Sequence, residues 1–157
     1  MKILLAACNA KYIHSNLAVY DLRAYASAYQ EHILLGEYTI NQTKDEILKD
    51  IYLSGHDAVF NHLFLYKLRH TLHKILPDVK FWTGGPEVSF DAEAFLRRTP
   101  QVTGVMVGEG EKTFLELVRY YVDGVGTLSE IPGIAYREGE EIHHNGWREL
   151  TDLSEIP

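Results

Sequence analysis

Cysteine is almost absent from this sequence: Cys8 is the only one among 157 residues. One cysteine excludes a disulfide within the chain, and it excludes an iron–sulfur site that takes three cysteine ligands from these residues alone. We therefore expect a cytoplasmic protein whose fold is held by its core rather than by cross-links.

Long apolar runs and surplus positive charge are also missing. No run approaches the roughly 18 residues that cross a bilayer, and the apolar start at residues 1–8 is too short for a signal peptide. Lys and Arg number 15 against 22 Asp and Glu, which gives a formal charge of −7. A phosphate backbone is bound by surplus Lys and Arg, so the sequence predicts neither a membrane nor a nucleic-acid partner.

Short apolar runs alternate with segments of helical period, in a chain of ordinary globular composition with 46% hydrophobic and 24% charged residues. This alternation is typical of strands joined by crossover helices. The length suits one domain with a short tail. Strands are expected at residues 3–8, 33–40, 58–60, 79–83 and 103–107.

Right-handed crossovers applied to this order predict a doubly wound α/β domain, Rossmann-like or flavodoxin-like, with a five-stranded parallel sheet and helices on both faces. After Gly126 the pattern changes, and two short runs around Gly139 predict a C-terminal β-hairpin. We therefore divide the chain into an α/β domain at residues 1–126 and a hairpin with the start of a linker at 127–157. Ligands of such sheets bind beyond the carboxyl ends of the strands.

Two glycine-rich loops follow neighbouring predicted strands: Gly84-Gly85-Pro86-Glu87 and Gly108-Glu109-Gly110-Glu111. Glycine is kept at a strand end where a ligand or another backbone must approach closely. Backbone amides at Lys112 and Thr113 open the next helix and offer hydrogen-bond donors. Two structural alternatives stay open: Pro86 fixes a tight turn, and Glu111 stabilises a helix dipole.

The first loop, residues 9–16, is rich in hydrogen-bonding side chains and precedes a helix start. It suits a large polar ligand, and His14 is a candidate axial metal ligand because imidazole is the usual protein ligand of that kind. The alternative is a surface His14 beside a helix cap formed by Ser15 or Asn16.

The remaining histidine clusters are poor metal sites. His70 and His73 share a helix face, yet no Cys or acidic partner stands beside them, so we favour a solvated face. His143 and His144 point to opposite sides of a strand. The sequence also lacks a Walker loop, a Gly-x-Gly-x-x-Gly motif after its first strand, and a Gly-x-Ser-x-Gly elbow, which disfavours nucleotide hydrolysis, dinucleotide binding and serine hydrolysis.

Three segments together resemble the N-terminal cobalamin-binding domain of B12-dependent radical SAM proteins: Asn9-Ala10-Lys11-Tyr12-Ile13-His14-Ser15-Asn16, Gly84-Gly85-Pro86-Glu87-Val88-Ser89 and Gly108-Glu109-Gly110-Glu111-Lys112-Thr113-Phe114. The resemblance spans nearly the whole chain. It implies that the corrin ring of cobalamin lies across the carboxyl edge of the sheet, and that the nucleotide tail enters a slot whose walls are glycines. The cofactor-binding residues it implies are Asn9, Lys11, Tyr12, His14, Ser15, Asn16, Asn61, Gly84, Gly85, Pro86, Glu87, Gly108, Glu109, Gly110, Glu111 and Thr113.

Two departures from the family pattern are visible. The Asp-x-His-x-x-Gly motif of the methionine-synthase type is missing, and such proteins often leave cobalt without a protein histidine, so no metal ligand is assigned and His14 is only a minor candidate. The segment at residues 60–66 is shorter than the family's usual loop, which leaves it open whether one wall of the site is complete.

Radical SAM chemistry needs three cysteines, so no such catalysis is expected from this chain alone. The resemblance implies a module of a longer radical SAM methyltransferase or related enzyme, whose 4Fe-4S cluster and S-adenosylmethionine belong to a domain that follows. Two other functions stay open: the nucleotide-sugar-binding half of a transferase that uses Glu87, Glu109 and Glu111, or a flavodoxin-like interaction domain. The last is disfavoured because Asn9-Ala10-Lys11 stands where a phosphoacceptor site has acids. A homodimer is possible.

Overall fold

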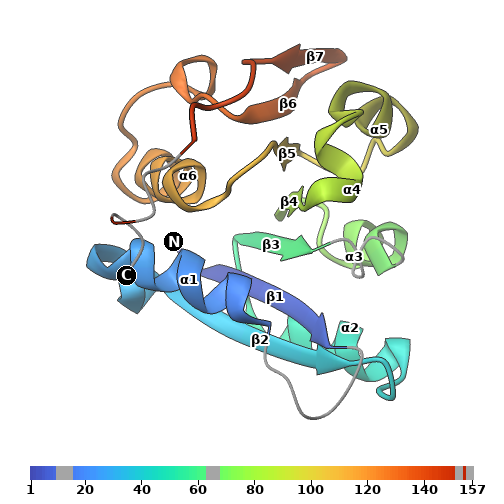
Figure 1. Cartoon of the computed structure of the whole chain (residues 1–157). Coiled ribbons are helices and arrows are strands. Elements are labelled where there is room, and N and C mark those ends of the chain that lie inside the picture. The colour runs from blue at the N-terminus through green and yellow to red at the C-terminus, as the bar shows by residue number, and fades with distance from the viewer. Residues whose placement is uncertain (10–15, 63–67, 151–153, 155–157) are drawn as a thin grey trace.

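The computed structural model describes residues 1–9, 16–62, 68–150 and 154, and within it the chain forms one seven-stranded sheet in the order β2-β1-β3-β4-β5-β6-β7 (Figure 1). The strands are β1 (Ile3–Asn9), β2 (Ile33–Thr39), β3 (Ala58–His62), β4 (Lys80–Gly84), β5 (Gly104–Met106), β6 (Ile134–Glu138) and β7 (Glu141–His144). The predicted doubly wound α/β fold is confirmed.

The parallel part of the sheet runs from β2 to β5, and its strand order reverses between β1 and β3. At such a reversal the crossovers on either side leave toward opposite faces, so a crevice opens at the carboxyl ends of the strands. This places the ends of β1 and β3 at the centre of the candidate site.

Helices cover both faces of the sheet. In Figure 1, α1 (Leu17–Tyr25) and α6 (Glu111–Asp123) lie together on one side. The other side carries α2 (Lys44–Ser54), α3 (Arg69–Ile75), α4 (Pro86–Ser89) and α5 (Ala92–Arg98). Two short 3-10 helices, η1 (Ser27–His32) and η3 (Leu128–Glu130), complete the described helices. None of the helices in the described part of the chain has the length and apolar character needed to span a membrane.

Alternation along the strands builds two cores. In β1, Ile3 and Leu5 face the core beneath α1 and α6, whereas Leu4 and Ala6 face the core beneath α2, α3 and α5. Both sets are buried, which is why a strand at the centre of a parallel sheet reads as a continuous apolar run.

Side-chain caps open two of the helices. The Thr43 and Glu46 capping box opens α2, with the Thr43 amide donating to Glu46 Oε2 at 2.7 Å. At α1, the Asn16 side chain accepts from the Ala18 amide at 3.2 Å and so acts as its cap.

Three details differ from the sequence-based expectation. The predicted hairpin is present as β6 and β7, but β6 also pairs antiparallel with β5, so the sheet is mixed and has seven strands instead of five. Asn9 ends β1 instead of opening a loop, because it continues the ladder with Thr39. The helical spacing of Leu17, Tyr20, Ala24 and Ala28 predicts a longer first helix, but α1 stops at Tyr25 because Ala26 leaves helical geometry at φ −90° and ψ 33°.

Candidate functional site

A cleft of about 240 Å³ opens at the carboxyl edge of the parallel strands, between the sheet and α1. Leu5, Phe60 and Asn61 reach it from β1 and β3. Its other walls come from the two glycine loops and from Ala18, Val19 and Leu22 of α1. The cleft therefore stands at the strand-order reversal, where the fold type predicts a ligand.

The cleft is hollow because several of its wall positions carry no side chain. Gly85 and Gly108 are held at φ +116° and +78°, backbone conformations that disfavour other residues, so the turns themselves demand glycine there. Gly84 is different, because its φ is ordinary and an added Cβ would meet Met106 Cε at 3.4 Å, a normal contact. The backbone therefore does not require glycine at position 84. The missing side chain instead leaves space in the cleft.

Ser89 ties the two glycine loops together. Its hydroxyl donates to the Gly85 carbonyl at 2.8 Å and accepts from the Gly108 amide at 3.2 Å. One buried side chain thus fixes the spacing between the loop after β4 and the loop after β5. The two loops act as one rigid wall of the cleft.

Asn61 places a buried hydrogen-bond acceptor at the cleft. Its side chain is 5% exposed, and its amide nitrogen donates to the Trp82 carbonyl at 2.7 Å. The other end of the amide, Oδ1, is buried and has no hydrogen-bond partner among the described residues. Buried polar atoms are rarely left unpaired in a native structure, so a ligand with a donor group fits this position.

Aromatic packing forms the floor behind the cleft. Phe60 stacks on Trp82 with ring centroids 6.0 Å apart and receives the edge of Phe114 at 5.0 Å. The Trp82 indole donates to the Tyr121 hydroxyl at 2.9 Å, and burial raises the pKa of Tyr121 to about 12. Tyr121 therefore stays neutral near pH 7, and this floor offers shape rather than charge.

Most of the predicted cofactor-binding residues that can be placed line the cleft: Asn16, Asn61, Gly84, Gly85, Pro86, Gly108, Gly110 and Glu111. Glu109 lines a second, adjoining hollow. Lys11, Tyr12, His14 and Ser15 lie outside the described residues.

Three predicted residues are placed away from the cleft lining. The Asn9 side chain donates to Glu37 Oε1 at 3.3 Å across the β1–β2 edge. Glu87 is an exposed residue of α4. Thr113 is fully buried, and its hydroxyl accepts from Arg148 Nε at 3.1 Å. A role of these three residues in cofactor binding stays a sequence prediction.

Sequence reasoning missed the contribution of α1. Ala18 is an exposed residue in the first turn of the helix, and Val19 and Leu22 follow on the side that meets the cleft. A small residue beside the Asn16 cap was the available signal, but only the packing of α1 over the sheet shows that it faces a ligand-sized space.

The described histidines form no metal centre. No group of three His, Cys, Asp or Glu side chains suited to a metal ion occurs in the described ranges. His70 is exposed, and His143 stacks on Tyr136 with centroids 5.1 Å apart. Burial raises the pKa of the Cys8 thiol, so this residue is not poised as a thiolate.

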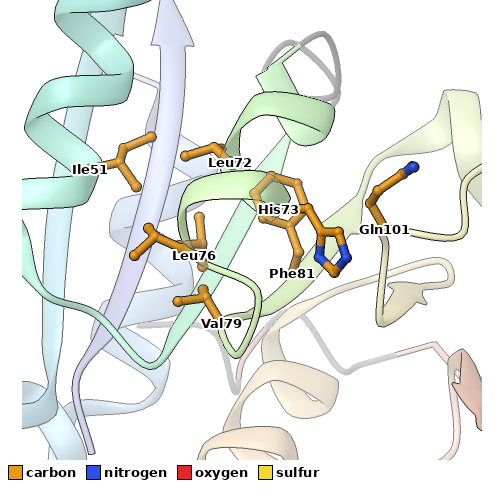
Figure 2. A pocket seen from close by; sticks show the side chains of 8 residues that line it. Ile51, Leu72, His73, Leu76, Val79, Phe81 and Gln101 are labelled. Atoms are coloured by element: carbon orange, nitrogen blue, oxygen red, sulfur yellow. The ribbon is translucent and has the colours of Figure 1, made fainter.

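A much smaller cavity lies on the opposite face of the sheet, beneath α2 and α3. It holds about 10 Å³ and is lined by apolar residues such as Ile51, Leu72 and Phe81. Figure 2 shows those side chains gathered beneath α3, with His73 and Gln101 to one side. Such a volume suits at most one water molecule, so this cavity is too small for a ligand.

Known proteins share this fold and part of this sequence. An uncharacterized methyltransferase of Pyrococcus horikoshii is 39% identical over 75 residues, which cover 47% of this chain and 16% of that protein. The cobalamin-dependent S-adenosylmethionine radical enzyme OxsB with aqua-cobalamin bound superposes with a TM-score of 0.74 at 21% identity, covering 100% of this chain and 24% of OxsB. The apo form of OxsB superposes with a TM-score of 0.71 at 21% identity, covering 99% of this chain and 23% of OxsB.

The match at the level of protein families covers most of the fold. The model of the B12 binding domain matches residues 3–118, which include the strands β1 to β5, the cleft and most of α6. This range contains every described residue that lines the cleft. The chain belongs to the B12-binding domain family.

Proposed function

We propose that this chain is a cofactor module that holds cobalamin at the carboxyl edge of its sheet, with the nucleotide tail of the cofactor in the cleft. The observation that carries the proposal is a cleft of about 240 Å³ at the carboxyl ends of the strands, where glycines form part of the wall. A well-formed concave site with few polar groups is the usual form of a cofactor pocket.

The chain's own residues divide the work of binding. Gly84 and Gly110 leave space for the tail, and the Ser89 link keeps the two loops at a fixed spacing. Asn61 Oδ1 accepts a hydrogen bond from a hydroxyl or amide group of the tail, which satisfies an acceptor that has no partner among the described residues. Bound cobalamin supplies a cobalt atom that can carry a methyl group.

We propose that the catalytic activity of the whole protein belongs to a further domain. This chain spans 16% of the methyltransferase and 24% of OxsB, the proteins it resembles. We propose that residues 127–157 lead toward a radical SAM domain with its own 4Fe-4S cluster and S-adenosylmethionine, as part of a methyltransferase or related enzyme. We also place the protein in the cytoplasm, because its one cysteine is free, and leave open a homodimer.

Retention of a coloured cofactor tests the proposal. The purified chain is mixed with hydroxocobalamin, passed over a desalting column and scanned in the visible range, with circular dichroism to show that it is folded. We expect about one cobalamin per chain. A folded chain that keeps no chromophore contradicts the proposal, and thermal stabilisation by a nucleotide sugar instead would favour the transferase alternative.

A further inference from the structure

A second hollow adjoins the cleft and shares three of its wall residues. This hollow, which we name the aromatic basin, holds about 320 Å³ and is lined by Gly85, Pro86, Ser89, Phe90, Gly108, Glu109, Trp147, Arg148 and Leu150. Gly85, Pro86 and Gly108 belong to both spaces. The two hollows therefore meet over the glycine loops, and one ligand of two parts could occupy both.

Large apolar side chains stand exposed in the basin. Phe90 is 83% exposed, Trp147 is 54% exposed and Leu150 is 85% exposed. The Phe90 and Trp147 rings contact each other with centroids 5.6 Å apart at 48°. Exposed apolar residues scattered singly need no explanation, but a cluster of three that lines a hollow marks a contact surface.

Trp147 rests directly on the loop after β5. A Cβ at Gly108 would come within 3.2 Å of Trp147 Cε3 and 3.4 Å of Cζ3, so the indole lies against the backbone of that glycine. The absence of a side chain at 108 therefore makes room for Trp147 as well as meeting the demand of φ +78°. This gives the glycine a role that the ligand alone does not explain.

The segment that carries Trp147 is fixed although it belongs to no strand. On one side, the Gly133 amide donates to the Gly146 carbonyl at 3.1 Å. On the other, the Arg148 guanidinium donates to the Thr113 hydroxyl and the Pro132 carbonyl, at 3.1 and 3.2 Å, and forms an ion pair with Glu116. The Arg148 side chain is only 13% exposed. Multiple charge-assisted hydrogen bonds from one guanidinium make a strong anchor.

We infer that Trp147 is a wall of the cofactor site, against which the corrin ring of cobalamin lies, and that Arg148 is the residue that positions it. The inference rests on the proposed function. A cofactor whose tail enters the cleft must lay its larger part over the mouth, and the basin opens there across the shared glycines. An indole held on a rigid segment gives contact area at a small loss of conformational freedom.

The test compares two ligands and matched variants. Hydroxocobalamin and cobinamide, which lacks the nucleotide tail, are titrated into the wild-type chain, Trp147→Ala, Trp147→Phe and the control Tyr52→Ala. Tyr52 lies on α2 and is 53% exposed, close to the exposure of Trp147, but it lines neither hollow. We expect Trp147→Ala to weaken both ligands by roughly tenfold, the Phe variant by about threefold or less, and the control not at all.

Arg148 is tested as a positioning residue by a double-variant cycle. Arg148→Ala should weaken cobalamin binding, and the double variant with Trp147→Ala should bind no worse than Trp147→Ala alone, because Arg148 acts through the indole. Additive losses would contradict this role.

The outcomes separate the inference from the proposed function. If the folded wild-type chain binds neither ligand, the proposed function itself fails. If the wild type binds and Trp147→Ala binds both ligands equally well, the inference alone is overturned, and the basin instead faces another part of the protein. A loss confined to cobalamin would assign Trp147 to the tail and would also overturn it.

Discussion

The two faces of the sheet are filled differently although the same strands supply both. The cavity beneath α2 and α3, whose lining side chains Figure 2 shows, holds about 10 Å³, whereas the cleft beneath α1 at the carboxyl edge holds about 240 Å³. Protein interiors are normally packed as densely as organic crystals. An open space of the larger size is therefore a feature that the fold does not need for its own stability.

The difference separates positions that serve the fold from positions that serve a ligand. On the filled face, Leu72 and Phe81 meet side chains of the opposite layer. On the hollow face, Gly84 and Ala18 occupy the corresponding layer boundary and leave the space empty. If the comparison is correct, stability and cofactor binding should respond to different substitutions.

The largest effect on stability should come from truncating the filled face. Leu72 is 3% exposed, so Leu72→Ala should lower the free energy of unfolding by about 3 kcal/mol. Leu22→Ala removes the same atoms beside the existing cleft and should lower it by only about 1 kcal/mol, because part of that side chain already faces open space. Urea unfolding of both variants measures the two values. Equal losses would mean that the two faces are packed alike.

A smaller effect should separate two glycines of the site. Gly84→Ala should change the free energy of unfolding by less than about 1 kcal/mol, because its backbone is ordinary and the new methyl group meets Met106 at a normal distance. Gly108→Ala should lower it by about 1–2 kcal/mol because of its positive φ. In contrast, Gly84→Ala should weaken cobalamin binding several-fold. Thermal unfolding and a cobalamin titration of each variant measure both effects. An unfolded Gly84→Ala variant would contradict the conclusion that glycine at position 84 serves ligand binding and not the fold.

The smallest effect is a pH dependence that belongs to the fold and not to the site. His56 is 6% exposed at the turn between α2 and β3, and burial, followed by the nearby positive charge of Lys2, lowers its pKa below the ordinary value. A lowered pKa in the folded state means that the unfolded chain binds the proton more tightly. Stability from the neutral ring is therefore complete above about pH 6.5 and declines as pH falls below it.

Substitution of His56 measures this contribution. In His56→Gln the fall in melting temperature between about pH 7 and pH 5 should be shallower than in the wild type, because one titrating group is gone. An identical slope in both proteins would show that other groups carry the acid sensitivity.

The sequence predicted the fold well because strand burial leaves a direct trace in composition. Runs such as residues 3–8 are apolar throughout, as strands buried on both faces must be. It predicted the glycine walls of the cleft for the same reason, since glycine at a strand end carries positional meaning. The pairing of β6 with the edge of β5 could not be predicted, because a hairpin has the same local sequence pattern whether or not it pairs with another strand.

The rest of the site depended on contacts between residues far apart in the sequence. Trp147 reads as part of a linker, and only its position on Gly108 makes it part of the wall. The Thr113 amide reads as a helix-start donor for a ligand, yet the residue is fully buried and its hydroxyl accepts a hydrogen bond from Arg148. Ala18 carries no polar or charged group, and its contribution to the site is the space that its small side chain leaves.

Filling that space gives the most direct measurement of the central claim, that the cleft receives the nucleotide tail. Ala18→Trp places a large ring in the cleft from an exposed position, and Leu17→Trp, at a neighbouring site that is 71% exposed and outside the cleft, is the control. Ala18→Trp should weaken hydroxocobalamin binding by roughly a hundredfold, about 2.7 kcal/mol, and leave cobinamide binding unchanged. Equal affinity of Ala18→Trp and the wild type for hydroxocobalamin, with both proteins folded, would contradict the account.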